Sequence, residues 1–206
     1  MAEDVPNRGN AGAPGAAGRL DSLMAAARTG TGPARKPAPV ESWHPPFCGD
    51  IDMRIARDGT WFYNGTPIGR PAMVKLFASI LRKDPERHVL VTPVECVGIK
   101  VEDVPFIAIE MHETPSPDGP ALRLRTNVDD EVLVDRDHPL RFERGEADGV
   151  VPYVLVRGGL WARLTRTLFF DLVERGEVED QGGTPMFGVR SSGTFFPMAP
   201  AAQMQG

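Results

Sequence analysis

The sequence lacks the features that mark several common classes of protein. Its 206 residues include only two cysteines, Cys48 and Cys96, too few for a disulfide framework. No apolar run approaches the roughly 20 residues that a membrane-spanning helix needs. Acidic residues outnumber basic ones by 28 to 23, whereas nucleic-acid-binding proteins usually carry a basic excess. We therefore expect a cytoplasmic protein with reduced thiols, no membrane span and no nucleic-acid partner.

Catalytic signatures are also missing. The chain contains no Gly-x-Ser-x-Gly elbow, no Walker loop and no strand-linked Gly-x-Gly-x-x-Gly sequence. Four histidines are scattered along the chain, and none follows His112 at the spacing of a zinc-binding helix. The pattern favours a binding protein over an enzyme, predicts neither a catalytic residue nor a metal site, and leaves any cofactor unknown.

Composition divides the chain into a leader and a globular part. The leader, residues 1–42, is rich in Gly, Ala and Pro, and we expect it to be largely disordered with a short helix near residues 19–28. From Trp43 onward, strand patterns alternate with turn signals such as Asn64-Gly65. We expect an N-terminal domain over residues 43–86 and a β-rich C-terminal domain over residues 87–206.

Two amphipathic helices are predicted, over residues 71–83 and 161–174, because apolar residues recur there every three or four positions. The apolar stripes are Met73, Leu76, Phe77, Ile80 and Leu81 in the first helix, and Trp161, Leu164, Leu168 and Leu172 in the second. Most of the remaining globular sequence reads as strands. The predicted fold is therefore α+β, with two related antiparallel units that each combine a β-meander and a helix.

A weak internal repeat supports this division. Residues 63–81 align without gaps on residues 156–174 with three identities, which are Gly65 with Gly158, Arg70 with Arg163 and Phe77 with Phe170. Each segment runs from a strand through a glycine turn into a predicted helix. Because the identities are few, the inference of a duplication depends mainly on this shared order of elements.

Arginines are the most suggestive polar residues. Arg157 and Arg163 lie on either side of the predicted turn at residues 158–159, and Arg54 and Arg70 lie in the first half. A guanidinium group pairs well with phosphate and carboxylate groups, so a local cluster of arginines would mark an anionic ligand. The alternative is ordinary ion pairing with the many Asp and Glu side chains, and the sequence leaves both open.

Two further features have a structural and a functional interpretation. Asp50 and Asp52 share one face of a predicted strand, where paired carboxylates could hold Mg²⁺ or act as acid and base. The alternative is a solvated strand face. Trp61, Phe62 and Tyr63 are consecutive and cannot all face one core, so at least one ring is expected at an interface or stacked on a ligand.

Five motifs in the globular part are distinctive. They are Pro45–Trp61 (PPFCGDIDMRIARDGTW), Leu90–Glu95 (LVTPVE), Val101–Phe106 (VEDVPF), Thr126-Asn127 and His138–Arg141 (HPLR). Together they resemble the proteobacterial domain-of-unknown-function family 1285 (DUF1285), over about residues 43–198. The resemblance implies a duplicated core, a C-terminal half superficially similar to pleckstrin-homology-like domains, a ligand site between the halves that suits a nucleotide-like molecule, and a role in signalling.

We therefore expect a non-enzymatic binding or signalling module that holds an anionic, nucleotide-like small molecule in a cleft between its halves. The expected ligand-binding residues are Asp50, Asp52, Arg54 and Trp61 from the first half, and Thr92, Glu95, Asn127, Arg157 and Arg163 from the second. One alternative is a protein-interaction adaptor with an exposed sheet edge. The other is a metal-dependent hydrolase that uses Asp50 and Asp52.

Overall fold

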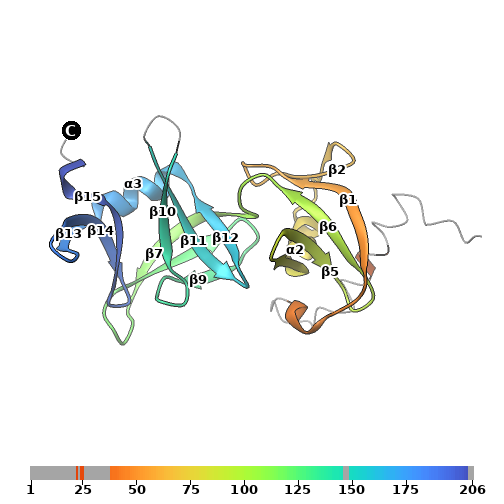
Figure 1. Ribbon diagram of the computed structural model, residues 1–206, viewed down its shortest axis with the longest axis horizontal. Coiled ribbons are helices and arrows are strands. Elements are labelled where there is room, and N and C mark those ends of the chain that lie inside the picture. The colour runs from red at the N-terminus through yellow and green to blue at the C-terminus, as the bar shows by residue number, and fades with distance from the viewer. Residues whose placement is uncertain (1–21, 23, 26–37, 146–148, 204–206) are drawn as a thin grey trace, which may run out of the picture.

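The computed structural model describes residues 22, 24–25, 38–145 and 149–203. Two six-stranded sheets, A and B, lie side by side along the long axis of the molecule, and a three-stranded sheet C lies beyond sheet B (Figure 1). The α+β fold with two related units is thus confirmed. The predicted disorder of residues 1–21, 23 and 26–37 falls outside the described residues, and within the predicted short helix Ser22, Met24 and Ala25 are helical. Residues 38–42 of the predicted leader belong instead to the globular part, because Ala38 and Val40 are buried in its core.

Sheet A forms the first unit, with the strand order β3-β2-β1-β6-β5-β4. All neighbouring strands are antiparallel except β1 and β6, which are parallel. The elements are the 3-10 helix η1 (Val40–Ser42), β1 (Phe47–Ile55), β2 (Trp61–Tyr63), β3 (Thr66–Pro67), α2 (Pro71–Ser79), β4 (Leu81–Asp84), β5 (Arg87–Val91) and β6 (Cys96–Val101).

Sheet B forms the second unit, with the order β10-β11-β12-β7-β8-β9, and β12 and β7 are its parallel pair. Its elements are β7 (Phe106–Thr114), β8 (Ala121–Thr126), β9 (Glu131–Leu133), β10 (Leu140–Arg144), β11 (Val150–Arg157), β12 (Leu160–Leu164) and then α3 (Arg166–Glu174). Sheet C follows as β13 (Glu177–Asp180), β14 (Pro185–Ser191) and β15 (Thr194–Pro200), and the 3-10 helix η3 (Ala201–Gln203) ends the described chain.

Sheets A and B have the same topology. Each consists of two three-stranded meanders, and the first strand of the first meander pairs in parallel with the last strand of the second. The repeat is therefore a property of whole sheets. The aligned segments 63–81 and 156–174 are not equivalent within it, because α2 joins the two meanders of sheet A whereas α3 follows the last strand of sheet B.

The first predicted helix is too long at its end. Helix α2 ends at Ser79, and Leu81 already lies in β4 with its side chain fully buried. Strand β4 continues through a tight turn at residues 85–86 into β5, and both strands belong to sheet A. The domain boundary predicted after residue 86 therefore falls inside sheet A, and the two sheets divide between Val101 and Phe106.

The second predicted helix begins too early. Gly158 and Gly159 have φ values of 48° and 74°, and this turn joins β11 to β12 as a hairpin. Trp161 and Leu164 consequently lie in a strand, not in a helix. Helix α3 starts only after Thr165, whose hydroxyl accepts a hydrogen bond from the backbone N–H of Leu168 at 3.4 Å. It lies between sheets B and C and packs against β7 and β14 (Figure 1).

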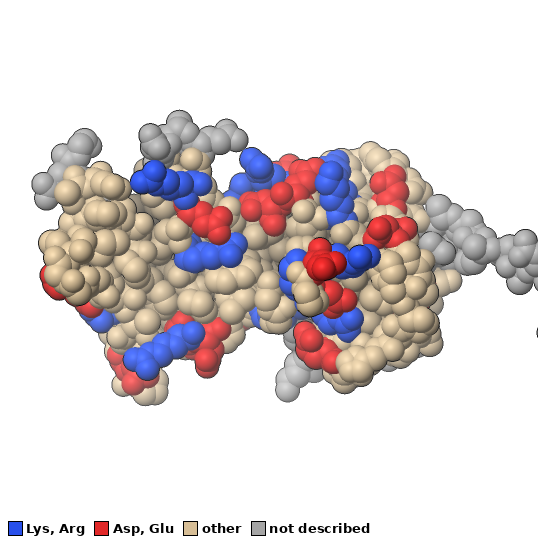
Figure 2. All heavy atoms as spheres, viewed as in Figure 1, with Lys and Arg blue, Asp and Glu red and all other residues tan. Residues whose placement is uncertain are grey.

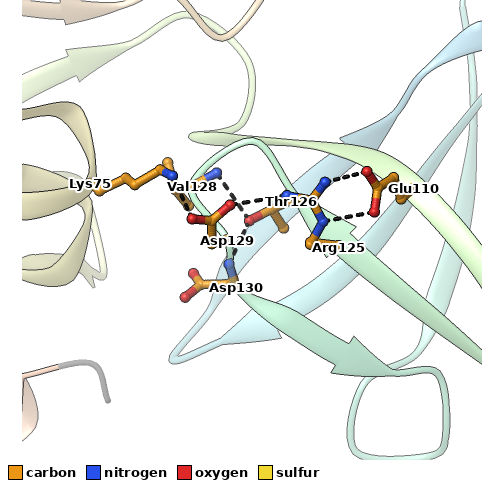
Figure 3. A network of polar contacts seen from close by, with 7 residues as sticks. All are labelled: Lys75, Glu110, Arg125, Thr126, Val128, Asp129 and Asp130. Carbon is orange, nitrogen blue, oxygen red and sulfur yellow. Dashed lines mark hydrogen bonds and ion pairs between the residues drawn. The ribbon is translucent and has the colours of Figure 1, made fainter. Parts of the chain in front are cut away.

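A chain of ion pairs crosses the boundary between the two units. Lys75 of α2 pairs with Asp129 in the turn between β8 and β9 (Figure 3). Asp129 also accepts a hydrogen bond from Arg125 at 3.0 Å, and Arg125 donates from Nε to Glu110 at 2.8 Å. The Lys75 contact lowers the pKa of Asp129, and the Arg125 contact lowers the pKa of Glu110. These carboxylates therefore remain charged at neutral pH and hold the turn against α2.

Arg157 makes a second and less exposed connection. Its guanidinium donates to the carbonyl oxygens of Ala78 at 2.7 Å and Leu81 at 3.4 Å, and to the carboxylate of Asp130 at 3.3 Å. The carbonyl groups at the end of a helix lack partners within the helix, so a cation there is favourable. Burial raises the pKa of Asp130, and Arg157 opposes that shift. A side chain of sheet B thus completes the end of a helix in the sheet A unit.

The substitution Arg157→Met tests this connection. It would leave the Asp130 carboxylate without its cation and would remove the guanidinium donor from the two carbonyl groups. We expect the free energy of unfolding to fall by about 2–4 kcal/mol, measured by urea denaturation. Arg123→Met is the matched control: Arg123 lies 3.7 Å from Glu131 in an exposed pair, and its loss should cost less than about 1 kcal/mol. Equal losses in the two variants would contradict the structural role of Arg157.

His88 predicts a loss of stability in acid. Burial within sheet A lowers the pKa of this imidazole to about 4, and Lys83, its partner across β4 and β5, acts in the same direction. The unfolded chain takes up this proton near pH 6.5, so stability present above that pH is lost as the pH falls from 6.5 towards 4. We expect this group to remove on the order of 2 kcal/mol between pH 7 and pH 4, measured by urea denaturation at both values.

Two substitutions isolate that effect. His88→Gln should flatten the pH dependence, because glutamine does not titrate. His44→Gln, which replaces an exposed histidine, should keep the wild-type profile. The assignment fails if the His88→Gln protein loses as much stability in acid as the wild type.

Candidate functional site

A pocket with a volume of about 430 Å³ lies where the turn between β1 and β2 meets the junction of β12 and α3. We call it the junction pocket, because Asp58 comes from the first unit and every other lining residue comes from the second. Most of the lining side chains are apolar, and two are arginines. The lining residues are Asp58, Ile107, Val150, Val151, Pro152, Arg163, Leu164, Thr165, Arg166 and Phe169.

The turn that carries Asp58 packs directly on sheet B. Gly59 has a φ of 84°, and a Cβ atom there would lie 2.7 Å from Cγ1 of Ile107 and 3.1 Å from Nδ2 of Asn127. This close approach and the positive φ both require glycine. The carboxylate of Asp58 accepts a hydrogen bond from the backbone N–H of Thr60 at 2.9 Å, which lowers its pKa. The first unit therefore contributes a fixed negative charge to the pocket.

Arg163 lies in register between Tyr153 of β11 and Ile107 of β7. Its guanidinium is 3.7 Å from the carboxylate of Asp103, in the segment that links the two sheets. Asp103 also accepts a hydrogen bond from the Tyr153 hydroxyl at 3.2 Å. Burial raises the pKa of Tyr153, and the nearby Asp103 charge adds to the shift. Asp103 is thus shared, and its contact with Arg163 is too long for a strong hydrogen bond.

Arg166 is the first residue of α3 and is exposed. Its guanidinium carbon lies 5.5 Å from the ring centroid of Phe170, a cation–π distance. Within the described parts of the chain, no carboxylate lies within ion-pair distance of it. Arg163 and Arg166 therefore supply two cationic groups to a pocket with an otherwise largely apolar lining. Such a combination suits a small molecule that has an acidic group and an apolar body.

Two of the nine predicted site residues belong to this region. Arg163 lines the junction pocket. Asn127 lies beside it: its Oδ1 accepts a hydrogen bond from the backbone N–H of Ile107 at 3.0 Å, and its Nδ2 faces Gly59. Arg157 also lies at the boundary between the units, but its guanidinium is occupied by Asp130 and by carbonyl oxygens of the first unit. Arg157 therefore has a structural role.

Three of the predicted residues have local structural roles. Trp61 is 1% exposed and stacks on Phe77 with 6.3 Å between ring centroids, so its ring cannot stack on a ligand. Thr92 is fully buried, and its hydroxyl accepts a hydrogen bond from the backbone N–H of Glu95 at 3.1 Å. Both residues of that pair therefore shape the turn between β5 and β6 within sheet A.

The remaining three residues lie along β1. The side chain of Asp50 is 75% exposed and is 3.9 Å from Arg87. Asp52 is also exposed. Arg54 donates to Glu102 at 2.7 Å and lies over the ring of Phe62. The nine predicted residues consequently do not meet in one cleft. Along β1, the side chains form ordinary ion pairs and a solvated strand face, as the alternative interpretation expected, and not a ligand site.

Sequence reasoning missed Asp58, Thr165, Arg166 and Phe169. One local signal was available, because a threonine before an apolar helical pattern is a typical N-cap. The helix predicted from residue 161 hid this signal, since it placed Thr165 in the interior of the helix.

Elsewhere in the described chain, neither the distribution of charge on one face of the molecule nor the metal-ligating side chains point to a second functional site. On the face drawn in Figure 2, basic and acidic side chains intermingle across both units and do not separate into areas of one sign. Among the residues that the structure describes, no group of three or more His, Cys, Asp or Glu could hold a metal ion. None of the described helices is long and apolar enough to cross a membrane.

Comparisons with known proteins agree with the two-unit architecture. Models of the N-terminal and C-terminal domains of DUF1285, a domain of unknown function, match residues 38–104 and 105–198. A crystal structure of a DUF1285 family protein from Silicibacter pomeroyi is 46% identical with a TM-score of 0.80, and the match covers 89% of this chain and 98% of that one. A DUF1285 family protein from Shewanella baltica is 28% identical over 59% of this chain and 89% of that one, with a TM-score of 0.48. No curated protein matches. The chain belongs to the DUF1285 family.

Proposed function

We propose that this protein is a non-enzymatic binding module that holds a small anionic molecule in the junction pocket. The observation that carries the proposal is the presence of Arg163 and Arg166 in a concave site whose other lining residues are mostly apolar. Ligand sites typically combine an apolar lining with a few polar groups that fix the orientation of the ligand. The guanidinium groups bind the acidic group, and Ile107, Val151 and Phe169 contact the rest of the molecule.

The location of the pocket suggests how binding is used. Its lining includes Asp58 from the first unit, while Arg163 and Arg166 come from the second. A ligand that contacts both units strengthens the contact between them, because it binds best when they are correctly placed. We propose that ligand occupancy in this way reports the presence of a small molecule, as a signalling module requires. A cytoplasmic location is part of the proposal, and the unpaired Cys48 and Cys96 agree with it.

A binding experiment tests the proposal. We expect a panel of small organic anions, including nucleoside monophosphates and carboxylates, to contain compounds that raise the Tm of the full chain. A ligand at about 100 times its Kd should raise the Tm by roughly 5–10 °C in a protein of this size. Arg163→Gln and Arg166→Gln should each reduce the shift, because each removes a cation from the pocket. Differential scanning fluorimetry measures these shifts.

Arg175→Gln is the matched control for this experiment. Arg175 caps the other end of α3, where its guanidinium donates to the carbonyl oxygen of Asp171 at 2.9 Å. Its loss changes the net charge by the same amount without touching the pocket, so the ligand shift should persist. Two results would reject the proposal: no stabilising anion in the panel, or equal shifts in all three variants and the wild type.

A protein-interaction adaptor is the second candidate function. Strand β13 is the edge of sheet C and pairs only with β14 within the described chain, and its Val178 is 60% exposed. An open edge of this kind can accept a strand from another protein. A stoichiometric partner captured by the wild type should then be lost with Val178→Lys and kept with Val94→Lys, a substitution at a 70% exposed valine of the β5–β6 turn. Equal capture by both variants, measured by pull-down, would exclude β13 as the docking edge.

A further inference from the structure

We infer that the ligand of the junction pocket is an apolar monocarboxylate, with one small ring or a short alkyl chain, and that a nucleotide binds there less tightly. This inference rests on the proposed function and narrows its ligand class. The supporting properties of the lining are its net charge, its few hydrogen-bonding groups and its apolar side chains.

The charge of the lining suits a single negative charge. Arg163 and Arg166 contribute two positive charges and Asp58 one negative charge, so the formal sum is 2 − 1 = +1. Asp103 reduces the positive charge further, because it lies 3.7 Å from Arg163. A carboxylate matches this sum, whereas a nucleoside monophosphate carries nearly two negative charges at neutral pH. The second charge would approach Asp58 and Asp103 without a cation to balance it.

Apart from the two arginines, the polar side chains of the lining are Asp58 and Thr165, and each already accepts a hydrogen bond. The hydroxyl of Thr165 already accepts a hydrogen bond from Leu168, and the carboxylate of Asp58 accepts one from Thr60. A ribose and a base have many donors and acceptors, and each one buried against apolar side chains without a partner is costly. Trp61, the ring that the sequence favoured for stacking on a base, is buried in the first unit.

The apolar lining defines the rest of the ligand. Six of the lining residues are apolar, namely Ile107, Val150, Val151, Pro152, Leu164 and Phe169. The volume of about 430 Å³ accommodates either an acid of this kind or a nucleotide, so the chemistry of the lining decides between them. An acid with one phenyl ring or a short alkyl chain buries apolar surface against these side chains.

Isothermal titration calorimetry on the full chain tests the inference. The probes are acetate, hexanoate, 3-phenylpropionate, the neutral amide 3-phenylpropanamide, and adenosine 5′-monophosphate. We expect 3-phenylpropionate or hexanoate to bind at least about tenfold more tightly than acetate, the amide and the nucleotide. Acetate lacks the apolar body, and the amide lacks the negative charge. Arg166→Gln should weaken binding of the acid about tenfold and leave binding of the amide unchanged.

A conservative substitution tests the role of charge directly. Asp58→Asn keeps an oxygen that can accept the Thr60 hydrogen bond and removes the negative charge, so the lining gains one net positive charge. We expect it to improve the affinity for adenosine 5′-monophosphate relative to 3-phenylpropionate by about threefold or more. An unchanged ratio of the two affinities would contradict the charge argument.

The remaining outcomes separate this inference from the proposed function. If the nucleotide binds more tightly than every acid and this binding is lost in Arg166→Gln, the monocarboxylate assignment is overturned. The proposal of an anion-binding pocket then remains in place. Equal binding of 3-phenylpropionate and its amide would overturn the requirement for a carboxylate. Binding of none of the five probes would overturn the monocarboxylate, and the wider anion panel then decides the proposed function independently.

Discussion

The guanidinium group of Arg157 constrains the arrangement of the two units. This guanidinium is partly buried, and it is paired with Asp130 of its own unit and with the carbonyl oxygens of Ala78 and Leu81 in the other. These contacts fix the end of α2 relative to sheet B. Once α2 is fixed, Lys75 reaches Asp129, and on the same boundary the glycine turn of the first unit packs on Ile107. The junction pocket exists because that turn lies where it does.

Much of the fold could be predicted from local chemistry, and the errors have a common cause. The turn at Asn64-Gly65 was predictable because both residues have positive φ, which few other residue pairs adopt readily. The ends of both helices were not. Leu81 and Trp161 continue the apolar spacing of a helix although they lie in strands, since a short apolar run is compatible with either structure. Sheet pairing decides between them, and that information lies far away in the sequence.

The candidate site was less predictable than the fold, because it depends on which arginine side chains are engaged in contacts between the two units. Arg157 and Arg163 looked alike in the sequence, yet one completes the end of a helix and the other lines a pocket. Trp61 has a large apolar side chain, and burying it in the core stabilises the fold more than leaving it exposed to stack on a ligand would. Arg166 could be recognised only after the start of α3 was known, since the predicted helix had placed it in mid-helix.

The pocket lies where the two copies of the duplicated sheet differ. After β12, the last strand of sheet B, the chain enters α3 at Thr165 and supplies Arg166 and Phe169. After β6, the equivalent strand of sheet A, the chain instead forms the short linker of residues 102–105, whose Glu102 pairs with Arg54 and whose Asp103 faces Arg163. A duplicated sheet alone would therefore not create this site. The divergence after the last strand gave one copy a helix that lines the pocket beside the Asp58 turn, and gave the other a linker whose Asp103 contacts the lining residue Arg163.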